Sequence, residues 1–473
     1  MLKKYKIKFL HDFYPMDPAL EIKYFFNESR DELDLQIKEK PEDFIVQEIT
    51  SNNILCDVSP VINLQEYIKS INLMIYLLTE PRTEEDITNF ICCSDFNKDY
   101  DLNTLKSLYK DLDYKPIIIK DKELRTNLHN YLSYNLFINT KTIDDQFIFE
   151  RSHSNTYNFV LKKVMMNTVD ACKFIERNIG CSVSFAGNKD KKAITYQEVS
   201  CKTNINNLLN FVFEYTECTN KDYDILRVIK FLEDIEITGD EQQIFDDIKK
   251  ETTVNNEQYK SCIGIYNIKG GHSKRLGDLK GNKFTIKIRN AADLKYKNIE
   301  NGFINYYGPQ RFGKAKNNHI VGEKILNKEY EEAINLIIKN SKGYADFIEK
   351  NFEECLRKCD NTERFIFKKL LYQKKVDYKQ IVLSMRREIR MLYLHSYQSF
   401  LFNKDVNKFI ETKQDFSDSV LKLQKMNDKL LKGGERKVLE KAKNVLAWQD
   451  GTDFVVSFEL NSSCYATMAL REL

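Results

Sequence analysis

One acidic residue stands among lysines in the stretch SFAGNKDKKAITYQ, which spans residues 184–197. Asp190 follows Lys189 and precedes Lys191 and Lys192, shortly after a glycine. Positive charge within a few ångströms favours the ionised form of a carboxylate, which can then act as a nucleophile or a base. Taken alone, a turn of this composition is more often a solvated loop. A second, independent motif is therefore needed.

A second stretch with chemically useful groups is NYYGPQRFG, which spans residues 305–313. Adjacent tyrosines offer flat faces for stacking, Asn305 and Gln310 offer amide groups, and Arg311 offers a guanidinium for phosphate. These groups are suited to binding an unstacked base. Because the chain contains 26 Tyr and 30 Phe, the stretch also fits a turn whose rings fill a core.

Several other chemistries lack sequence support. There is no G-x-x-x-x-G-K-[ST] phosphate loop, and in NKDK the aspartate is one position too early for a guanine-reading Asn-Lys-x-Asp. G-x-G-x-x-G, H-E-x-x-H and G-x-S-x-G motifs are also absent. The 11 cysteines and 6 histidines show no zinc-type spacing. A nucleotide-driven, metal-dependent or serine-type enzyme is disfavoured.

Length and composition predict an intracellular protein of two or three domains. The 473 residues are 42% hydrophobic, and 73 basic against 70 acidic residues leave a net charge of +3, too small for global steering toward nucleic acid. The scattered cysteines favour reduced thiols. The basic N-terminus has no apolar core before Asp12, and INLMIYLL is too short to span a bilayer, so we expect neither secretion nor membrane insertion.

The elements that must position Asp190 and Asn305 follow from periodicity. We expect a helix over 164–179 ended by Gly180, and then a short strand that places Asp190 on a strand-end loop. Alternation predicts strands at Leu35/Ile37, Phe44/Val46, 284–288 and in the last segment, and helices over 68–140 and 322–443. Within these, Leu124, Leu128 and Leu132 share one helix face, and 319–339 reads as one amphipathic helix.

Together the two motifs closely resemble the signatures of the TruD-type pseudouridine synthases, whose eukaryotic branch modifies tRNA and other RNAs. Four further stretches resemble blocks of that family in the family's order: IKEKPEDFIVQEI, LGDLKGNKFTIKIRN, LYLHSYQSFLFN and SCYATMALREL. The resemblance covers most of the chain outside about 56–150. Six ordered motifs make coincidence very unlikely.

The resemblance implies an α+β fold. A pseudouridine synthase catalytic domain with a mixed antiparallel sheet would comprise 1–55, 151–318 and 452–473, interrupted by a second α+β (TRUD) domain over 319–451. The helical insertion, 56–150, contains DKELRTNLH, which looks like an Arg-x-x-x-His nucleic-acid-binding module. Lys122, Arg125 and His129 equally fit a solvated helix face.

The activity that the resemblance implies is isomerisation of uridine in tRNA to pseudouridine, with no cofactor and no metal. Asp190 would be the catalytic carboxylate, acting either by covalent attack on the sugar or by assisting loss and re-addition of uracil. Lys38 would pair with Asp190. The neighbouring Lys189, Lys191 and Lys192 would face phosphates or solvent.

A pocket around the uracil is also implied. Tyr307 and Tyr465 match the family's aromatic pocket positions, Asn305 would bind the uracil edge, and Tyr307 could accept the C5 proton. The remaining substrate-binding candidates are Glu42, which would orient its neighbours, Phe44, a pocket wall, and Lys189, Gln310 and Arg311, toward RNA.

Some positions depart from the family pattern, and some questions stay open. Val164 and Met165 replace polar residues, Ser463 replaces a glycine before Tyr465, and Ser396 replaces an alanine. The target uridine is not indicated, and messenger or small nuclear RNA remain open as further substrates. We expect a monomer in the nucleus or cytoplasm. The alternative is an RNA-binding or RNA-folding module with little or no catalysis.

Overall fold

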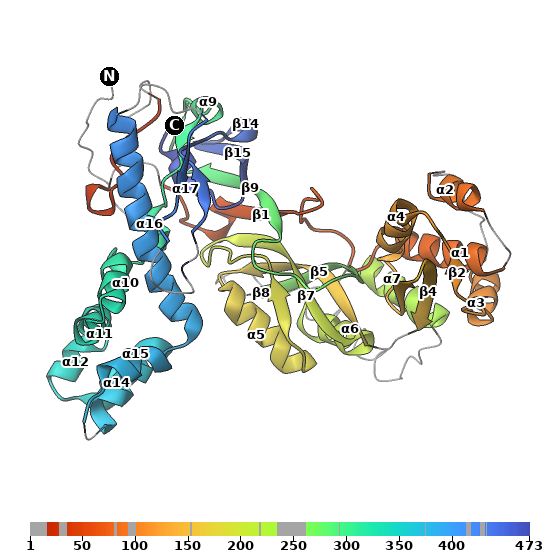
Figure 1. Cartoon of the computed structure of the whole chain (residues 1–473), viewed down its shortest axis with the longest axis horizontal. Coiled ribbons are helices and arrows are strands. Elements are labelled where there is room, and N and C mark those ends of the chain that lie inside the picture. Colours follow the sequence, from red (N-terminus) through yellow and green to blue (C-terminus); the bar gives the residue numbers. More distant parts are fainter. Residues whose placement is uncertain are drawn as a thin grey trace. The chain divides into compact units, whose positions relative to one another are not determined.

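The computed structural model describes residues 17–27, 36–79, 83–92, 101–151, 154–216, 219–233, 262–292, 294–373, 375–412, 418–425, 431 and 433–473. These form two compact units, Lys38–Lys287 and the combination of Met1–Ile37 with Ile288–Leu473. Each unit mixes helices and strands, which confirms the α+β class (Figure 1). The N-terminal stretch before Asp17 and the strand residue Leu35, both subjects of sequence predictions, lie outside the described residues.

The Lys38–Lys287 unit is built on a mixed sheet in the order β9–β1–β7–β5–β8, with β6 also beside β7. Strands β1 and β7 are parallel, whereas the β1–β9, β5–β7, β5–β8 and β6–β7 pairs are antiparallel. The strands are β1 (Phe44–Thr50), β5 (Ser154–Val164), β6 (Val183–Phe185), β7 (Ile194–Asn204), β8 (Cys262–Gly270) and β9 (Leu279–Ile288).

Several predicted elements of this sheet are confirmed. Strand β9 buries Phe284, Ile286 and Ile288, as their alternation requires, and β1 begins at Phe44. The strand expected around Ile37 is not formed in the described part, where Gln36 makes only an isolated bridge. Residues Pro41–Asp43 form a short 3-10 turn (η2) that leads into β1.

Helices α5 (Thr168–Ile179) and α6 (Ile205–Tyr215) pack beside this sheet (Figure 1). Gly180 ends α5 with a φ of 73°, a left-handed conformation that glycine adopts without steric cost, so the predicted stop is confirmed. The predicted start is wrong, because Val164 is the last residue of β5 and the helix begins at Thr168. Val164 and the residues directly before it belong to β5.

The segment from 56 to 150 contains helices and a small sheet. Leu124, Leu128 and Leu132 are all buried on α4, which confirms their shared face. An antiparallel sheet in the order β2–β4–β3 was not expected from the helical texture. The elements are α1 (Leu64–Thr79), α2 (Glu84–Cys92), α3 (Leu102–Lys110), β2 (Ile117–Ile118), α4 (Lys122–Leu132), β3 (Ile138–Ile143) and β4 (Gln146–Arg151), followed after the main strands by α7 (Asn220–Leu232).

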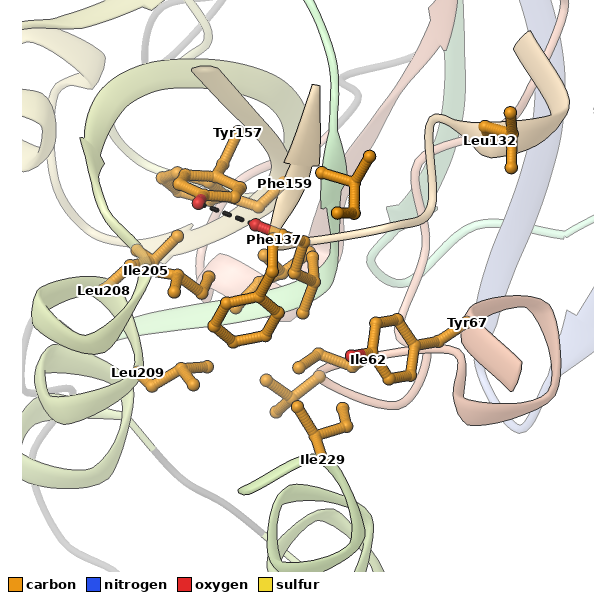
Figure 2. Packing of buried hydrophobic residues seen from close by; sticks show 14 of the residues in the cluster. Ile62, Tyr67, Leu132, Phe137, Tyr157, Phe159, Ile205, Leu208, Leu209 and Ile229 are labelled. Atoms are coloured by element: carbon orange, nitrogen blue, oxygen red, sulfur yellow. Dashed lines mark hydrogen bonds between the residues drawn. The ribbon is translucent and has the colours of Figure 1, made fainter. Parts of the chain in front are cut away.

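One hydrophobic core joins this segment to the main sheet. Figure 2 shows Tyr157 and Phe159 of β5 and residues of α6 packing with Phe137 and Ile62. The buried hydroxyl of Tyr157 donates a hydrogen bond to the carbonyl of Leu136 at 2.8 Å, so its polar atom is satisfied within the core. The insertion therefore shares its core with the sheet.

Two candidate nucleic-acid-binding side chains of α4 make internal contacts. Arg125 donates to the carbonyls of Ile119 and Lys120 and forms an ion pair with Asp145 at 2.8 Å. His129 lies between the hydroxyls of Thr140 and Thr142, at 2.8 and 3.0 Å. These contacts fasten α4 to its neighbouring loops and to β3.

The first helices of the second unit differ from the sequence prediction. The single amphipathic helix expected over 319–339 is two helices, because the chain turns at 327–329. Lys324 of the first helix ion-pairs across this turn with Glu329 and Glu332. The helices of this part are α9 (Asn298–Asn301), α10 (Asn318–Leu326), α11 (Tyr330–Lys339), α12 (Tyr344–Ile348), α13 (Phe352–Lys358), α14 (Asn361–Tyr372), α15 (Tyr378–Ser384) and α16 (Arg387–Thr412).

The predicted helical texture up to Lys443 is wrong beyond Thr412, since the described residues that follow form strands. The strand-like end of the chain is confirmed by β15, which pairs antiparallel with β14. Among the described residues, no helix combines the length and apolarity needed to cross a membrane. The remaining elements are η1 (Pro18–Leu20), β10 (Phe303–Ile304), η3 (Pro309–Phe312), β11 (Val420–Lys422), β12 (Glu435–Lys437), β13 (Leu439–Glu440), β14 (Lys443–Asp450), β15 (Asp453–Asn461) and α17 (Ala466–Leu470).

Candidate active site

Parallel strand pairing brings the Asp190 loop to the segment that precedes β1. Asp190 lies in the loop between β6 and β7, four residues before Ile194, and Ile194 is the register partner of Ile45 in β1. Because β1 and β7 run in the same direction, the chain that enters β1 and the chain that enters β7 meet at the same edge of the sheet. Lys38 and Asp190 are thereby neighbours although 152 positions separate them.

The expected pairing of Lys38 with Asp190 is present. The Lys38 Nζ donates to Asp190 Oδ2 at 2.9 Å and lies 3.8 Å from the centre of the Phe44 ring. Lys38 has a φ of 60°, a left-handed conformation that costs an ordinary residue on the order of 1–2 kcal/mol. Such strain is concentrated at functional sites, where the surrounding structure holds it in place. The Asp190 side chain remains 36% exposed and accessible to a substrate.

A second lysine, not anticipated from the sequence, fixes the backbone of the loop. Lys163 on β5 is fully buried, and its Nζ donates to the carbonyl of Asp190 at 2.8 Å. Burial lowers the pKa of Lys163 to about 8, while the nearby Asp190 opposes that shift. Lys163 thus orients the main chain of the residue whose carboxylate Lys38 holds.

Two neutral side chains support the same loop. The amide of Lys189 donates to Thr168 Oγ1 at 3.0 Å, and the Thr168 hydroxyl donates to Gln197 Oε1 at 2.9 Å. The Gln197 amide in turn donates to the carbonyl of Gly187 at 3.1 Å. The loop therefore presents Asp190 from a backbone that is anchored on both sides.

The side chain of Lys189 does not face phosphates or solvent, which corrects the expectation for this residue. It is 4% exposed and forms an ion pair at 2.6 Å with Glu48 of β1, itself 1% exposed. Burial raises the pKa of Glu48, and the ammonium of Lys189 opposes that shift. Lys191 and Lys192 are exposed, as expected.

The ring of Phe44 lies against Lys38. Phe44 is buried and meets Phe284 edge-on, with ring centres 6.1 Å apart. Glu42 is exposed. The buried carboxylate of Asp43 stabilises the turn before β1, because it accepts from the amide of Lys40 at 2.9 Å.

The NYYGPQRFG motif lies in the other unit, directly after β10. Asn305 is 2% exposed; its Oδ1 accepts from Arg436 at 2.6 Å and its Nδ2 donates to the carbonyl of Lys437 at 3.1 Å. Arginine can only donate and a carbonyl can only accept, so these two partners fix which way the amide points. Within the described ranges, one N–H and one oxygen lone pair of Asn305 have no partner.

The Tyr307 ring is surrounded by aromatic and cationic groups. Phe402 and Tyr465 approach it edge-on, with ring centres 5.5 and 6.0 Å away, and the Arg436 guanidinium lies 4.2 Å from its centre. Burial raises the pKa of the Tyr307 phenol, whereas Arg436 opposes that shift. The two tyrosines predicted as pocket walls are therefore in mutual contact.

Asn403 of α16, which sequence reasoning missed, holds the Tyr307 backbone. Its Oδ1 accepts from the Tyr307 amide at 2.8 Å, and its Nδ2 donates to the Tyr307 carbonyl at 3.1 Å and to the Leu20 carbonyl at 3.0 Å. Both main-chain polar groups of a buried residue are thereby satisfied.

The end of the motif packs against α17. Gln310 is exposed, and its Oε1 accepts from the Thr467 hydroxyl at 3.2 Å. A side-chain carbon on Gly308 would lie 2.8 Å from this oxygen and 3.2 Å from Tyr465, so a larger residue there would require the Gln310 side chain to move. The Arg311 guanidinium lies 5.6 Å from the Tyr307 ring, and its buried Nε has no hydrogen-bond partner among the described residues.

The departures from the family pattern have visible structural consequences. Ser463 adopts a φ of 70°, the left-handed conformation that a glycine would adopt freely, and its carbonyl accepts from Arg436 at 2.6 Å. Met165 also has a positive φ, of 54°. Ser396 is fully buried on α16, and its hydroxyl has no partner in the described part of the chain.

Four site-building residues were not found from the sequence: Glu48, Lys163, Asn403 and Arg436. Each supports a functional candidate that is distant along the chain; Arg436, for example, is 131 positions from Asn305. Only the resemblance of the segments around Glu48, Lys163 and Asn403 to family blocks could have drawn attention to them. The described residues contain no cluster of three His, Cys, Asp or Glu side chains that could hold a metal ion.

Comparison with known proteins shows similarity to one family. The sequence model described as tRNA pseudouridine synthase D (TruD) matches residues 263–421, which include the whole NYYGPQRFG motif. A protein named probable tRNA pseudouridine synthase D 1, from Methanocaldococcus jannaschii, is 25% identical over 386 residues, which are 68% of this chain and 86% of that protein. The chain is thus similar to the TruD family both in this segment and over most of its length.

Other TruD relatives match over a shorter range. A probable tRNA pseudouridine synthase D from Pyrococcus furiosus is 27% identical over 273 residues, 54% of this chain and 55% of that protein. This chain thus aligns with only about half the length of that relative. A TruD crystal structure from Methanosarcina mazei aligns with 98% of this chain and 95% of its own, with 16% identity and a TM-score of 0.45.

Proposed function

We propose that this chain is a tRNA pseudouridine synthase that isomerises uridine to pseudouridine, with Asp190 as its catalytic carboxylate. The ion pair between Lys38 and Asp190, on a loop anchored by Lys163, carries the proposal. This arrangement holds an accessible carboxylate in one orientation beside a compensating cation. Preorganisation of this kind is what a reacting group requires.

The reaction breaks the bond between C1′ of the ribose and N1 of uracil, and then joins C1′ to C5. Asp190 assists the first step either by bonding to C1′ or by taking the C2′ proton as uracil leaves. In both routes the uracil turns and its C5 attacks C1′, which either displaces the Asp190 carboxylate from C1′ or is accompanied by return of the proton from Asp190 to C2′. Loss of the C5 proton and protonation of N1 complete an isomerisation that needs no net redox change.

The Tyr307 cluster supplies groups suited to a base. We assign stacking to Tyr307 and Tyr465, and recognition of the uracil edge to the free N–H and lone pair of Asn305. Tyr307 is also the proposed acceptor of the C5 proton; burial raises its phenol pKa, and the charge of Arg436 opposes that shift.

The remaining candidates have supporting roles. Phe44 holds Lys38 by its ring face, and Lys189 acts through its buried pair with Glu48, which fixes the loop. Gln310 and Arg311 are assigned to RNA contacts, and the exposed Glu42 is assigned to orienting its neighbours.

Tritium release tests the enzyme directly. Unmodified tRNA carrying 5-tritiated uridine is incubated with wild-type protein or Asp190→Ala, and tRNA binding is measured in parallel. We expect release from wild type and a loss of at least about 10³-fold in the variant with affinity nearly unchanged, because the carboxylate acts on bonds rather than on binding. An active Asp190→Ala would refute the assigned role.

The second candidate is an RNA-binding or RNA-folding module, which predicts tRNA binding without release from wild type. The observation that favours it is the exposed basic pair Lys191 and Lys192, since phosphate contacts alone give binding. The same assay with messenger or small nuclear RNA tests these as further substrates. We propose that the chain acts as a monomer in the nucleus or cytoplasm, because each chain carries both motifs.

A further inference from the structure

We propose that Arg436 supplies the positive charge that stabilises the uracil base while it is detached from the ribose. This inference rests on the proposed function and extends it to a residue outside the recognised motifs. Arg436 lies on β12 and is 6% exposed. Its guanidinium is the cation nearest to the Tyr307 ring among the described side chains.

All the hydrogen-bond acceptors of Arg436 in the described part of the chain are neutral. Its Nε donates to the Asn305 carbonyl at 3.1 Å, its Nη2 donates to Asn305 Oδ1 at 2.6 Å, and its Nη1 donates to the Ser463 carbonyl at 2.6 Å. The Tyr306 carbonyl is a more distant acceptor, at 3.4 Å. These contacts satisfy most of the N–H groups but do not cancel the charge.

No carboxylate within the described ranges forms an ion pair with Arg436. Other cations of the same unit do have such partners: Arg289 pairs with Asp453 at 2.8 Å, and Lys316 pairs with Asp17 at 2.6 Å. Buried charges are usually paired, because an unpaired charge in a low-dielectric interior is costly. A buried guanidinium with only neutral partners therefore favours a ligand that carries or develops negative charge.

The charge lies beside the groups assigned to the base. The guanidinium is 4.2 Å from the centre of the Tyr307 ring and 5.6 Å from that of Phe402, and it holds the Asn305 amide directly. Arg311, which belongs to the motif itself, adds a second cation 5.6 Å from the Tyr307 ring. A base stacked in this cluster would be within the field of an uncompensated positive charge.

Negative charge develops on uracil during the proposed reaction. When the C1′–N1 bond breaks, its electron pair stays on the base, and the charge spreads over N1 and the two carbonyl oxygens. The same anion forms whether Asp190 bonds to C1′ or takes the C2′ proton. It disappears when C5 donates electrons to C1′ and N1 is protonated, so a fixed cation stabilises the intermediate more than the substrate or product.

The contacts of Arg436 also keep its charge fixed. It joins the Asn305–Tyr307 segment to the turn at Ser463, two residues before Tyr465. A cation that is already oriented costs no reorganisation when the charge develops. Arg436 thus acts as a positioning residue for the base-binding segment and as an electrostatic group for the leaving base.

Leaving-group dependence separates the electrostatic role from a purely structural one. The probe is tRNA with either uridine or 5-fluorouridine, because fluorine withdraws electrons and already stabilises the uracil anion. Single-turnover cleavage of the glycosidic bond is compared for wild type, Arg436→Gln and Arg436→Lys. We expect Arg436→Gln to be about 10- to 100-fold slower on uridine, with a deficit several-fold smaller on 5-fluorouridine.

The lysine variant and a remote control keep the test decisive. Arg436→Lys retains the positive charge but lacks the planar guanidinium, so its cleavage rate should fall less than that of Arg436→Gln. It also provides the test if Arg436→Gln does not fold. Arg390→Gln on α16, where Arg390 donates to the carbonyl of Leu383, should match wild type on both substrates. Thermal melts and tRNA binding are recorded for each variant.

The outcomes distinguish this inference from the proposed function. If wild type is active and the Arg436 variants are slowed by the same factor on uridine and on 5-fluorouridine, Arg436 has a purely structural role. That result would overturn this inference but not the proposed function. A wild type that binds tRNA but makes no pseudouridine would overturn the proposed function, and with it the basis of the inference.

Discussion

The Asp190 loop and the Tyr307 cluster orient one functional side chain each, but they do so by different physical means. Around Asp190, charged side chains make the main contacts: Lys38 pairs with the carboxylate, Lys163 donates to the backbone carbonyl, and Lys189 pairs with Glu48. Around Tyr307, Arg436 and the amide of Asn403 form hydrogen bonds with neutral groups, and aromatic rings pack against the tyrosine.

This difference has consequences for how each region responds to change. Charge pairs in a buried setting depend strongly on both partners being present and correctly protonated. Hydrogen bonds to neutral carbonyls do not titrate and depend mainly on backbone geometry. We therefore expect the Asp190 loop to be sensitive to charge and pH, and the Tyr307 cluster to be sensitive to conformation.

The largest expected effect comes from breaking the buried pair behind the loop. Glu48→Gln leaves the Lys189 ammonium, 4% exposed, without its counter-charge. We expect a loss of about 3–5 kcal/mol in the free energy of unfolding, because an unpaired buried charge is strongly destabilising. Urea denaturation of the variant and wild type measures the difference.

A double variant provides the matched control for this pair. Glu48→Leu combined with Lys189→Met removes both charges and replaces them with apolar groups of similar size, so most of the stability should return. A single variant that is no less stable than wild type would contradict the view that charge holds this loop.

The next effect is a pH dependence that originates at Lys163. Its pKa of about 8 in the folded protein lies below that of an exposed lysine, about 10.4, so the unfolded chain binds more protons between these values. The contribution of Lys163 to stability therefore rises as the pH increases from about 8 to 10.4, and below pH 8 its burial cost is fully present.

Comparison with Lys163→Met isolates this titration from others. The difference in unfolding free energy, wild type minus variant, should increase by on the order of 2 kcal/mol between pH 8 and pH 10. Denaturation series at several pH values measure it. A difference that stays flat with pH would show that the ammonium is not desolvated in solution.

The smallest expected effect tests whether the Tyr307 cluster depends on backbone conformation. Ser463→Gly removes the steric cost of a φ of 70° while keeping the carbonyl that Arg436 binds. We expect a gain of a few tenths to about 1 kcal/mol, because the freedom that glycine adds to the unfolded chain offsets part of the relief. Ser463→Ala, which keeps the Cβ, should show no gain; equal gains from both would exclude backbone strain as the cause.

Local sequence signals predicted several elements of the fold. Gly180 marks the end of α5, the alternation at Phe284 marks β9, and three leucines mark the buried face of α4. These succeed because the determining residues lie within a few positions of one another. The same reasoning failed at 319–339, where the helical periodicity of the sequence continues across a turn between two helices. It also failed after Thr412, where short strands depend on partners elsewhere in the chain.

The candidate site was only partly accessible to sequence reasoning. The Lys38–Asp190 pair, taken from family resemblance, is present in the structure. The outward orientation expected for Lys189 was wrong, because its direction depends on Glu48, which is 141 positions away and becomes a neighbour only through the pairing of β1 and β7. Arg436 shows the same limit, since nothing near it in the sequence indicates what it contacts.

The continuous core between the insertion and the main sheet bears on how this unit unfolds. Phe137 and Ile62 of the insertion lie in one buried cluster with Tyr157 of β5 and Leu208 of α6 (Figure 2). Segments that share one core lose their stability together, so they melt as one cooperative block. The insertion is therefore not an exchangeable module: its removal would expose apolar surface of the sheet and helices that carry the Asp190 loop.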